Sequence, residues 1–212
     1  DYVRRNGLRG RIFEWGLTRA DRIVVQNHDQ LDLLRRNYHR SALVIKNAYH
    51  ISDTPPIDKP YILWVGRAEP LKQPELFFQL VRRFPNEQFV MVAQSAVYHR
   101  HLLTQLKTQA QEIPNLKFID YVPFSEIDNW FRQAKVFINT SDDYEGFPNT
   151  FIQSALHATP IVSLKVNPDN FINQHQCGLC ADGDPGKLAS SLQELLADPA
   201  LRAKLGNNAL NY

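Results

Sequence analysis

The sequence is short of sulfur: it contains only two cysteines and one methionine among 212 residues. Two cysteines cannot stabilise a chain of this length through a disulfide framework, so the composition indicates a reducing compartment. The longest apolar runs, such as residues 61–65, have the length of a β-strand, and no segment is expected to span a membrane. No signal peptide opens the chain, and we therefore expect a cytoplasmic location.

Several motifs that would define a chemistry are also missing. No G-x-G-x-x-G follows a predicted strand and no G-x-x-x-x-G-K-[ST] occurs, which excludes the dinucleotide fingerprint and the phosphate-loop ATPases. No G-x-S-x-G nucleophile elbow is present. Cys177 and Cys180 have C-x-x-C spacing, but without a second pair a packing role is favoured over a zinc or redox site. His99 and His101 are two residues apart and cannot share one helical face, so no metal site is predicted.

The composition is otherwise that of a globular protein, with 43% hydrophobic and 22% charged residues. The formal net charge is +2, and residues 1–50 carry ten Lys/Arg against five Asp/Glu. This excess is too small to predict nucleic-acid binding. Arginines interleave with apolar residues over residues 4–17, which predicts either a helix packed between domains or a basic amphipathic helix in peripheral contact with a membrane surface.

From residue 60 onward, short apolar runs alternate with segments of helical period. The runs are apolar almost throughout, as is typical of strands in a sheet covered on both faces. This alternation predicts an α/β fold with a Rossmann-like, doubly wound parallel sheet whose ligand binds beyond the carboxyl ends of the strands. Strands are expected at residues 61–65, 88–93, 116–121, 135–139 and 160–164, and helices at residues 74–83, 99–113, 125–133, 148–158, 185–197 and 200–210.

The domain organisation follows from one proline-rich segment. Residues 51–59 contain Pro55 and Pro56, which fit neither a helix interior nor a central strand, and they are the best linker in the chain. Residues 1–50 offer two short strands, at 22–26 and 42–46, and two helices, which are too few to form a core of their own. We therefore expect a remnant of a preceding domain at 1–50, a linker at 51–59, one complete Rossmann-like domain at 60–198 and the start of a closing helix at 199–212.

The first candidate site follows the strand at residues 61–65. Gly66 gives the backbone freedom, and Arg67 and Lys72 flank the tip of the loop. Arginine offers a two-pronged donor and lysine a point charge, a pair that suits a diphosphate. Two solvated cations on a surface loop are the alternative.

The second candidate site is the loop at residues 142–150, after the strand at 135–139. Pro148 suits the first position of a helix, so that the backbone N–H groups of Asn149 and Thr150 would face an anion. Gln153 lies one turn further along the same face as Asn149, and Glu145 stands before the helix, where it could accept hydrogen bonds from sugar hydroxyls. The alternative is a core helix preceded by a solvated acidic loop.

Taken together, these two loops resemble the group 1 (family 4) glycosyltransferases. The resemblance rests on Gly66-Arg67 with Lys72, followed by Glu145-Gly146-Phe147-Pro148-Asn149. It implies the C-terminal, donor-binding half of a retaining enzyme of the GT-B fold, preceded by a remnant of the acceptor domain. The implied substrate is a nucleotide-diphosphate sugar, the implied acceptor an unidentified glycan or lipid in polysaccharide or glycoconjugate biosynthesis, and no metal cofactor is needed.

The resemblance also implies roles for single residues. Arg67 and Lys72 would bind the pyrophosphate, and Glu145, the first acid of the family's E-x7-E pattern, would contact the donor sugar. The second acid, which would bind the ribose, is replaced here by Gln153. The other implied donor-binding residues are Gly66 in the first loop, Tyr121 and Val122 near the base, and Gly146, Phe147, Pro148, Asn149 and Thr150 around the phosphate or sugar.

One further departure and two alternative functions belong with this resemblance. Ala93-Gln94-Ser95 stands where the family tends to have a glycine-rich turn. A non-catalytic nucleotide-binding or regulatory module of the same fold is the alternative that Gln153 supports. A sugar-nucleotide epimerase is disfavoured by the loop at residues 145–149. The chain alone is expected to be inactive, because the acceptor domain is cut short.

Overall fold

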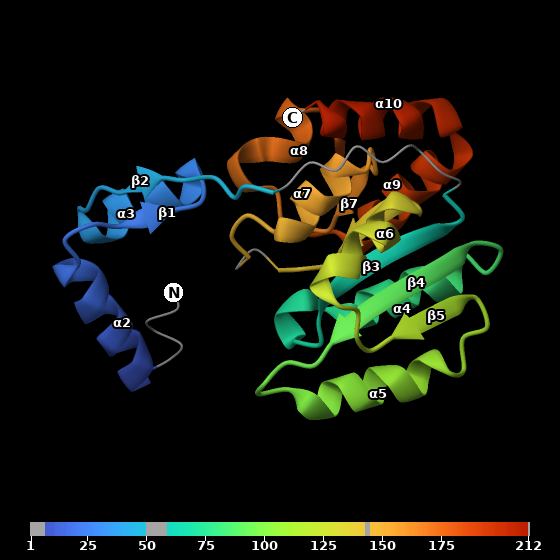
Figure 1. Cartoon of the computed structure of the whole chain (residues 1–212), viewed down its shortest axis with the longest axis horizontal. Coiled ribbons are helices and arrows are strands. Elements are labelled where there is room, and N and C mark those ends of the chain that lie inside the picture. Colours follow the sequence, from blue (N-terminus) through green and yellow to red (C-terminus); the bar gives the residue numbers. More distant parts are fainter. Residues whose placement is uncertain (1–6, 50–58, 143–144, 212) are drawn as a thin grey trace. The chain divides into compact units, whose positions relative to one another are not determined.

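The computed structural model describes residues 7–49, 59–142 and 145–211. The chain divides into two compact units, Asp1–Ala48 and Tyr49–Tyr212 (Figure 1). In the described residues no helix is both long and apolar enough to cross a membrane.

The N-terminal unit contains two helices and a minimal sheet. Helix α2 (Gly7–Arg19) buries only Gly10, and α3 (His28–Tyr38) buries Leu31 and Leu34. Strands β1 (Val24–Val25) and β2 (Leu43–Val44) pair in parallel and are shorter than the predicted five-residue strands. On α2 the side chains of Leu8, Ile12 and Trp15 are exposed. Peripheral membrane contact by this segment stays a prediction.

The C-terminal unit is built on one six-stranded parallel sheet in the order β5-β4-β3-β6-β7-β8. This confirms the predicted α/β fold class. Five strands fall where the apolar runs predicted them, and the sixth lies in the stretch that contains Cys177 and Cys180. The strands are β3 (Tyr61–Arg67), β4 (Gln88–Gln94), β5 (Leu116–Ile119), β6 (Ala134–Asn139), β7 (Ile161–Ser163) and β8 (Gly178–Cys180).

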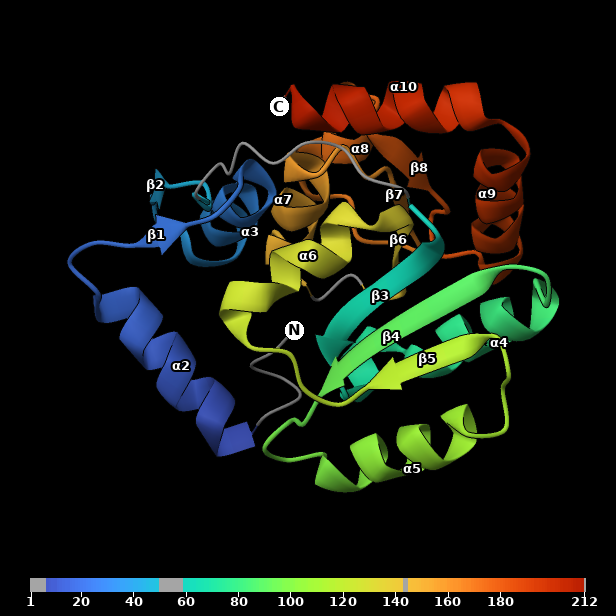
Figure 2. The same cartoon turned by 45° about the vertical axis from the view of Figure 1, so that its right-hand side comes forward.

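Helices cover both faces of this sheet, because successive strand residues enter two different cores. In β3, Ile62 and Trp64 join one core, whereas Tyr61 and Leu63 join the other. The first core is closed by α4 (Pro74–Arg83), α5 (Arg100–Ala110) and α9 (Pro185–Ala197). The second is closed by α6 (Ile127–Arg132), α7 (Asn149–Leu156) and α8 (Phe171–Gln174), and α10 (Pro199–Leu210) contributes Ala209 to it (Figure 2).

Three short 3-10 segments complete the unit: η1 (Pro70–Lys72), η2 (Phe124–Glu126) and η3 (Pro168–Asn170). The segment η2 occupies the first residues of the predicted helix at 125–133, so α6 begins only at Ile127. Pro148 is the N-cap of α7 with extended backbone, and the prediction that it is the first helical residue was wrong by one position. A proline is acceptable there because the helix needs no N–H from its cap residue.

The strand order fixes where a ligand can bind. From β3 the sheet grows in one direction through β4 to β5 and in the other through β6 and β7 to β8. The connections after β3 and β6 therefore depart to opposite faces, which opens a crevice beyond the carboxyl ends of these two strands. The two candidate loops of the sequence follow β3 and β6, so topology brings them to this one place.

Lys59 joins the start of the C-terminal unit to the end of α7. Its Nζ donates to the carbonyl oxygens of His157 and Ala158, at 2.7 and 2.8 Å, and to Thr159 Oγ1 at 3.0 Å. A cation at a helix C-terminus opposes the negative end of the helix dipole. Burial, together with the charge of Arg202, lowers the pKa of Lys59 to about 8. Lys59, the last residue of the predicted linker, is thus fixed to the helix whose other end faces the crevice.

Candidate functional site

A pocket of about 570 Å³ lies at the carboxyl ends of β3 and β4 and beside the start of α7. This volume is within the range of pockets that bind small molecules. Nine of the twelve predicted site residues line it, although they come from three separate segments of the chain, at 66–72, 121–122 and 145–153. They are Gly66, Arg67, Lys72, Tyr121, Val122, Glu145, Asn149, Thr150 and Gln153.

Three predicted residues do not line the pocket. Phe147 packs against Phe151 and Phe171, with ring centroids 6.2 and 5.1 Å apart, and so holds the loop to the core. Pro148 is buried as the N-cap of α7, and Gly146 lies between Glu145 and this anchor. A role for these three residues in cradling phosphate or sugar stays a prediction.

Four pocket residues were missed by sequence reasoning: Val65, Gln94, Phe124 and Ile127. Val65 and Gln94 could have been found, because each stands at or near the carboxyl end of a predicted central strand. The Gln94 side chain reaches across to the next connection, where its Nε2 donates to the carbonyl of Val122 at 3.3 Å. Phe124 and Ile127 gave no such signal, since they belong to a turn and a helix.

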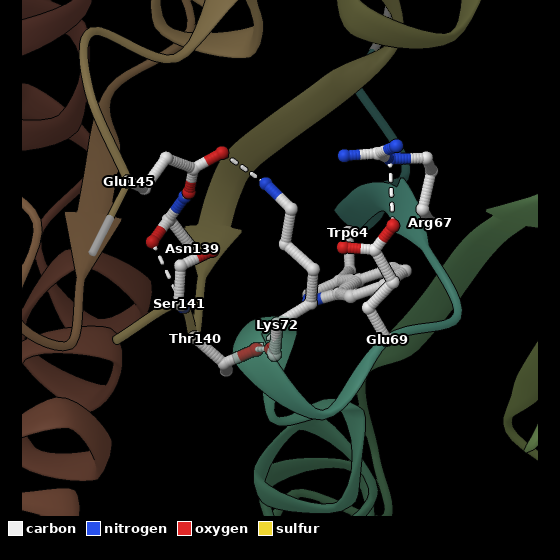
Figure 3. A network of polar contacts seen from close by, with 8 residues as sticks. All are labelled: Trp64, Arg67, Glu69, Lys72, Asn139, Thr140, Ser141 and Glu145. Atoms are coloured by element: carbon white, nitrogen blue, oxygen red, sulfur yellow. Dashed lines mark hydrogen bonds and ion pairs between the residues drawn. The ribbon is translucent and has the colours of Figure 1, made fainter. Parts of the chain in front are cut away.

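Lys72 and Glu145 form an ion pair inside the pocket (Figure 3). Lys72 comes from η1 after β3, and Glu145 comes from the loop after β6. Their side chains are only 14% and 15% exposed, so water screens the pair poorly. Asn139 at the end of β6 also donates from Nδ2 to the other carboxylate oxygen of Glu145, at 3.4 Å, and its Oδ1 accepts from the backbone N–H of Ser141.

A buried hydroxyl fixes the backbone at Lys72. Thr140 Oγ1 accepts a hydrogen bond from Trp64 Nε1 at 2.9 Å and donates one to the carbonyl of Lys72 at 2.5 Å (Figure 3). Thr140 is fully buried and the Trp64 indole is 2% exposed. This chain of bonds links β3, η1 and the segment after β6, and it sets the position from which Lys72 reaches Glu145.

Gly66 serves this arrangement in a way the sequence did not suggest. It lies within β3 and not in a turn, and its φ is not positive. A Cβ at this position would lie 2.9 Å from Cη2 of Trp64, because the indole ring covers the strand there. The glycine is therefore needed for the close approach of the ring that holds Thr140, and not for backbone freedom.

We expect Thr140→Val to lower the free energy of unfolding by about 1–3 kcal/mol, because it leaves the buried Trp64 N–H and Lys72 carbonyl without their partner. The matched control is Thr108→Val on α5, whose exposed hydroxyl bonds only the carbonyl one turn earlier. Urea unfolding of the two variants measures the difference. Equal stability of both variants would show that the bond does not hold the loop.

Arg67 stands at the rim of the pocket. Its side chain is 64% exposed, and its Nε is 3.0 Å from Oε1 of Glu69. The Glu69 side chain is 17% exposed, but solvent around the guanidinium screens the pair, so the pair contributes little to stability. Arg67 can therefore turn toward a bound anion at small cost, whereas Lys72 is already held in place.

The start of α7 forms another wall, through Asn149 and Thr150. These are the first helical residues, so their backbone N–H groups lie at the positive end of the helix dipole. The dipole of α7 produces a positive potential at this end of the helix, which favours an anion in the pocket. At the other end of α7, Lys59 offsets the negative potential of the same dipole. Further around the rim, Tyr121 and Phe124 are 69% and 76% exposed, so two aromatic faces are available to a planar ligand.

Gln153 lines the pocket as predicted, yet it is only 5% exposed. Its Nε2 donates to the hydroxyl of Tyr49 at 2.9 Å, and the hydroxyl lies 3.1 Å from Oδ1 of Asp128. The amide is thus part of a chain of polar groups that begins at the first residue of the C-terminal unit. This connection was not anticipated from the sequence.

The remaining candidates of the sequence lie outside the pocket. Cys177 is fully buried in the second core, as its predicted packing role requires, and burial raises the pKa of its thiol to about 12. His157 is half-buried at the end of α7, where burial lowers its pKa. The described parts of the chain contain no group of three or more His, Cys, Asp or Glu side chains that could hold a metal ion.

Fold and pocket together define a Rossmann-like domain with a cationic site at the switch point of its sheet. Residues 59–198, more than half of the chain, match the family model described as glycosyl transferases group 1. The chain belongs to this family. This confirms the resemblance to the group 1 glycosyltransferases.

Known proteins agree with this assignment. The D-inositol 3-phosphate glycosyltransferase of Xylanimonas cellulosilytica is 28% identical over 159 residues, which cover 73% of this chain and 38% of that protein. The structure of Anabaena HepE in complex with UDP-glucose superposes on the whole chain with a TM-score of 0.84 at 16% identity and is covered to 65%. Sucrose-phosphate synthase from Thermosynechococcus elongatus gives a TM-score of 0.78 at 22% identity, with 92% of this chain and 54% of that protein covered.

These two structures share the fold with this chain. The match spans 38–41% of the length of the first two curated relatives. The chain therefore spans less than half the length of these two relatives.

Proposed function

We propose that this chain is the donor-binding half of a retaining glycosyltransferase, which holds a nucleotide-diphosphate sugar for transfer to an acceptor on the other domain. The observation that carries the proposal is the convergence of Lys72, Glu145 and the start of α7 in one pocket at the switch point of the sheet. Solved neighbours that contain UDP or UDP-glucose support a uridine nucleotide as the first ligand to test.

Each group has a role that follows from its chemistry. Among the described residues, Glu145 is the only acceptor for Nζ of Lys72, so two of the three ammonium protons remain for phosphate oxygens. Arg67 adds a two-pronged donor from the rim, and the N-terminal N–H groups of α7 complete an anion site. Glu145, held by Lys72 and Asn139, presents a carboxylate that can accept from the hydroxyls of the donor sugar.

The same groups can carry the transfer step without a metal ion. Negative charge develops on the diphosphate as it leaves the anomeric carbon, and fixed cations and N–H dipoles stabilise such charge. We infer hexosyl transfer with retention, to a glycan or lipid acceptor. Both features rest on the family resemblance, and the acceptor belongs to the domain of which residues 1–50 are the proposed remnant.

A second candidate is a nucleotide-binding module without transferase activity. The observation that favours it is Gln153, a neutral residue where the family pattern has an acid. A neutral hydrogen bond contributes about 0.5–1.5 kcal/mol, against about 1.5–3 kcal/mol for a charged one, so ribose would be held less firmly here. Product analysis of the full-length protein with a panel of nucleotide sugars separates the two functions.

We expect the chain to bind a nucleoside diphosphate and to transfer no sugar on its own, because both candidate phosphate loops lie in the C-terminal unit. Calorimetry with UDP, GDP, ADP and CDP, with and without a chelator, measures binding. An assay with labelled nucleotide sugars measures transfer. If this chain alone transfers sugar to an acceptor, the assignment of donor binding to one domain and acceptor binding to the other is wrong. If it binds none of the four diphosphates, the proposed function is wrong.

A further inference from the structure

Three side chains form a relay behind the pocket: Gln153 on α7, Tyr49 at the start of the C-terminal unit and Asp128 on α6. Gln153 lines the pocket, and Tyr49 and Asp128 do not. The Tyr49 ring packs against Phe124 at a centroid distance of 6.0 Å, and all three relay residues are at least partly buried.

The direction of the hydrogen bonds in this relay is determined from one end. The Tyr49 hydroxyl donates its proton to Oδ1 of Asp128, because a carboxylate oxygen is an acceptor. Burial raises the pKa of Tyr49 above its ordinary value, and the hydroxyl therefore keeps this proton at neutral pH. The phenolic oxygen is then left to accept, and it must accept from an N–H of Gln153.

This fixes the amide of Gln153. The bond from Nε2 to Tyr49 fixes which side of the amide carries the nitrogen, so the carbonyl oxygen and the second N–H remain for a ligand. Among the described residues none donates a hydrogen bond to this oxygen. A hydroxyl of the ligand can donate a hydrogen bond to this amide oxygen, as it would to a carboxylate oxygen at the same position.

We propose that Tyr49 and Asp128 are positioning residues that orient Gln153 as a neutral hydrogen-bond acceptor for a hydroxyl of the bound nucleotide, and so set the preference of the pocket for ribose. This inference rests on the proposed function, since it requires a nucleotide in the pocket. It assigns a role to Tyr49, which lies 104 residues from Gln153 and belongs to neither candidate loop.

Shape-preserving variants test the orientation separately from packing. Tyr49→Phe keeps the ring on Phe124 and removes both hydrogen bonds. Asp128→Asn keeps the volume but supplies both a donor and an acceptor, so the direction of the relay is no longer fixed. Tyr38→Phe, in the N-terminal unit and outside the pocket lining, is the matched control. Each protein is titrated with UDP, 2′-deoxy-UDP and 3′-deoxy-UDP, and thermal unfolding confirms that it is folded.

We expect wild type and Tyr38→Phe to prefer UDP over at least one deoxy analogue. Tyr49→Phe and Asp128→Asn should each reduce this ratio of dissociation constants by about two- to tenfold, the value of one neutral hydrogen bond. Gln153→Ala should reduce it equally, and adding Tyr49→Phe to Gln153→Ala should change it no further, because the relay acts only through the amide.

The outcomes distinguish this inference from the proposed function. If wild type binds UDP but Tyr49→Phe and Asp128→Asn keep its preference, the relay does not orient Gln153 and the inference is wrong while the function stands. If Gln153→Ala also keeps the preference, Gln153 does not contact the ribose, and the inference again falls. If the folded wild-type chain binds none of UDP, GDP, ADP and CDP, both are overturned. If it binds another of these diphosphates in place of UDP, the same titrations are run with that diphosphate and its deoxy analogues.

Discussion

Replacing Lys72 by alanine is expected to weaken UDP binding by about 10- to 150-fold, the equivalent of about 1.5–3 kcal/mol for hydrogen bonds to a charged group. The loss has two parts. The ammonium no longer reaches the phosphates, and Glu145, which is 15% exposed, is left with its negative charge turned toward them. Binding of uridine, which has no phosphate, should change by less than twofold.

Arg67→Ala should have a smaller effect, within about tenfold, because this side chain is 64% exposed and solvent screens its charge. The double variant Lys72→Ala/Glu145→Gln should recover part of the affinity lost in Lys72→Ala, since it removes the unpaired carboxylate. Lys107→Ala is the control, because Lys107 is also ion-paired, with Asp120, but lies outside the pocket lining.

Calorimetric titration of UDP and uridine into the five proteins measures these differences. If Lys72→Ala binds UDP as tightly as wild type, the ion pair with Glu145 serves the fold and not the phosphate. If Arg67→Ala is the weaker binder of the two single variants, the rim and not the buried pair holds the diphosphate. Either result would assign the phosphate groups to a different part of the pocket.

The second large effect is expected for Gly206→Ala in α10. A Cβ at this position would lie 2.2 Å from the carbonyl oxygen of Ala158, at the end of α7. The same oxygen accepts from Lys59 Nζ at 2.8 Å, so it cannot move freely. Although alanine favours a helix over glycine by about 1 kcal/mol, we expect a net destabilisation of about 1–3 kcal/mol from overpacking against a backbone atom.

The control for this variant is Asn207→Ala, the exposed neighbour in the same helix. It gains helix propensity without meeting the Ala158 carbonyl, so it should be neutral or slightly stabilising. Thermal unfolding should therefore move the melting temperature in opposite directions for the two variants. A rise in melting temperature for Gly206→Ala would show that α10 does not pack closely on the end of α7.

The packing of α10 against the end of α7 also affects the pocket, because the start of the same helix lines the pocket. Its start lines the pocket through Asn149 and Thr150, and its end is held by Lys59 and Gly206. A helix fixed at one end presents its N–H groups at a defined position at the other. Preorganisation of this kind increases the effect of dipoles on developing charge.

Local chemistry in the sequence determined much of the fold. The apolar runs predicted five strands of the sheet because strands covered on both faces have no polar side, and β3 shows this by sending alternate residues into two cores. The bounds of α4 and α9 agree with the predicted helices, since each begins with a proline at its first helical position. Loops after β3 and β6 could be chosen as the site because a parallel sheet binds ligands at its carboxyl edge.

Tertiary structure alone decided which groups act together. No local pattern links Trp64 to Thr140, 76 residues away, or Tyr49 to Gln153, 104 residues away. The structural need for glycine at position 66 could not be predicted either, because no pattern in the neighbouring residues indicates that the Trp64 ring packs against it. Sequence periodicity records which side of an element is buried, whereas hydrogen bonds between distant elements depend on how the elements pack. The cationic site could therefore be predicted from residue types, but the groups that orient Lys72 and Gln153 could not.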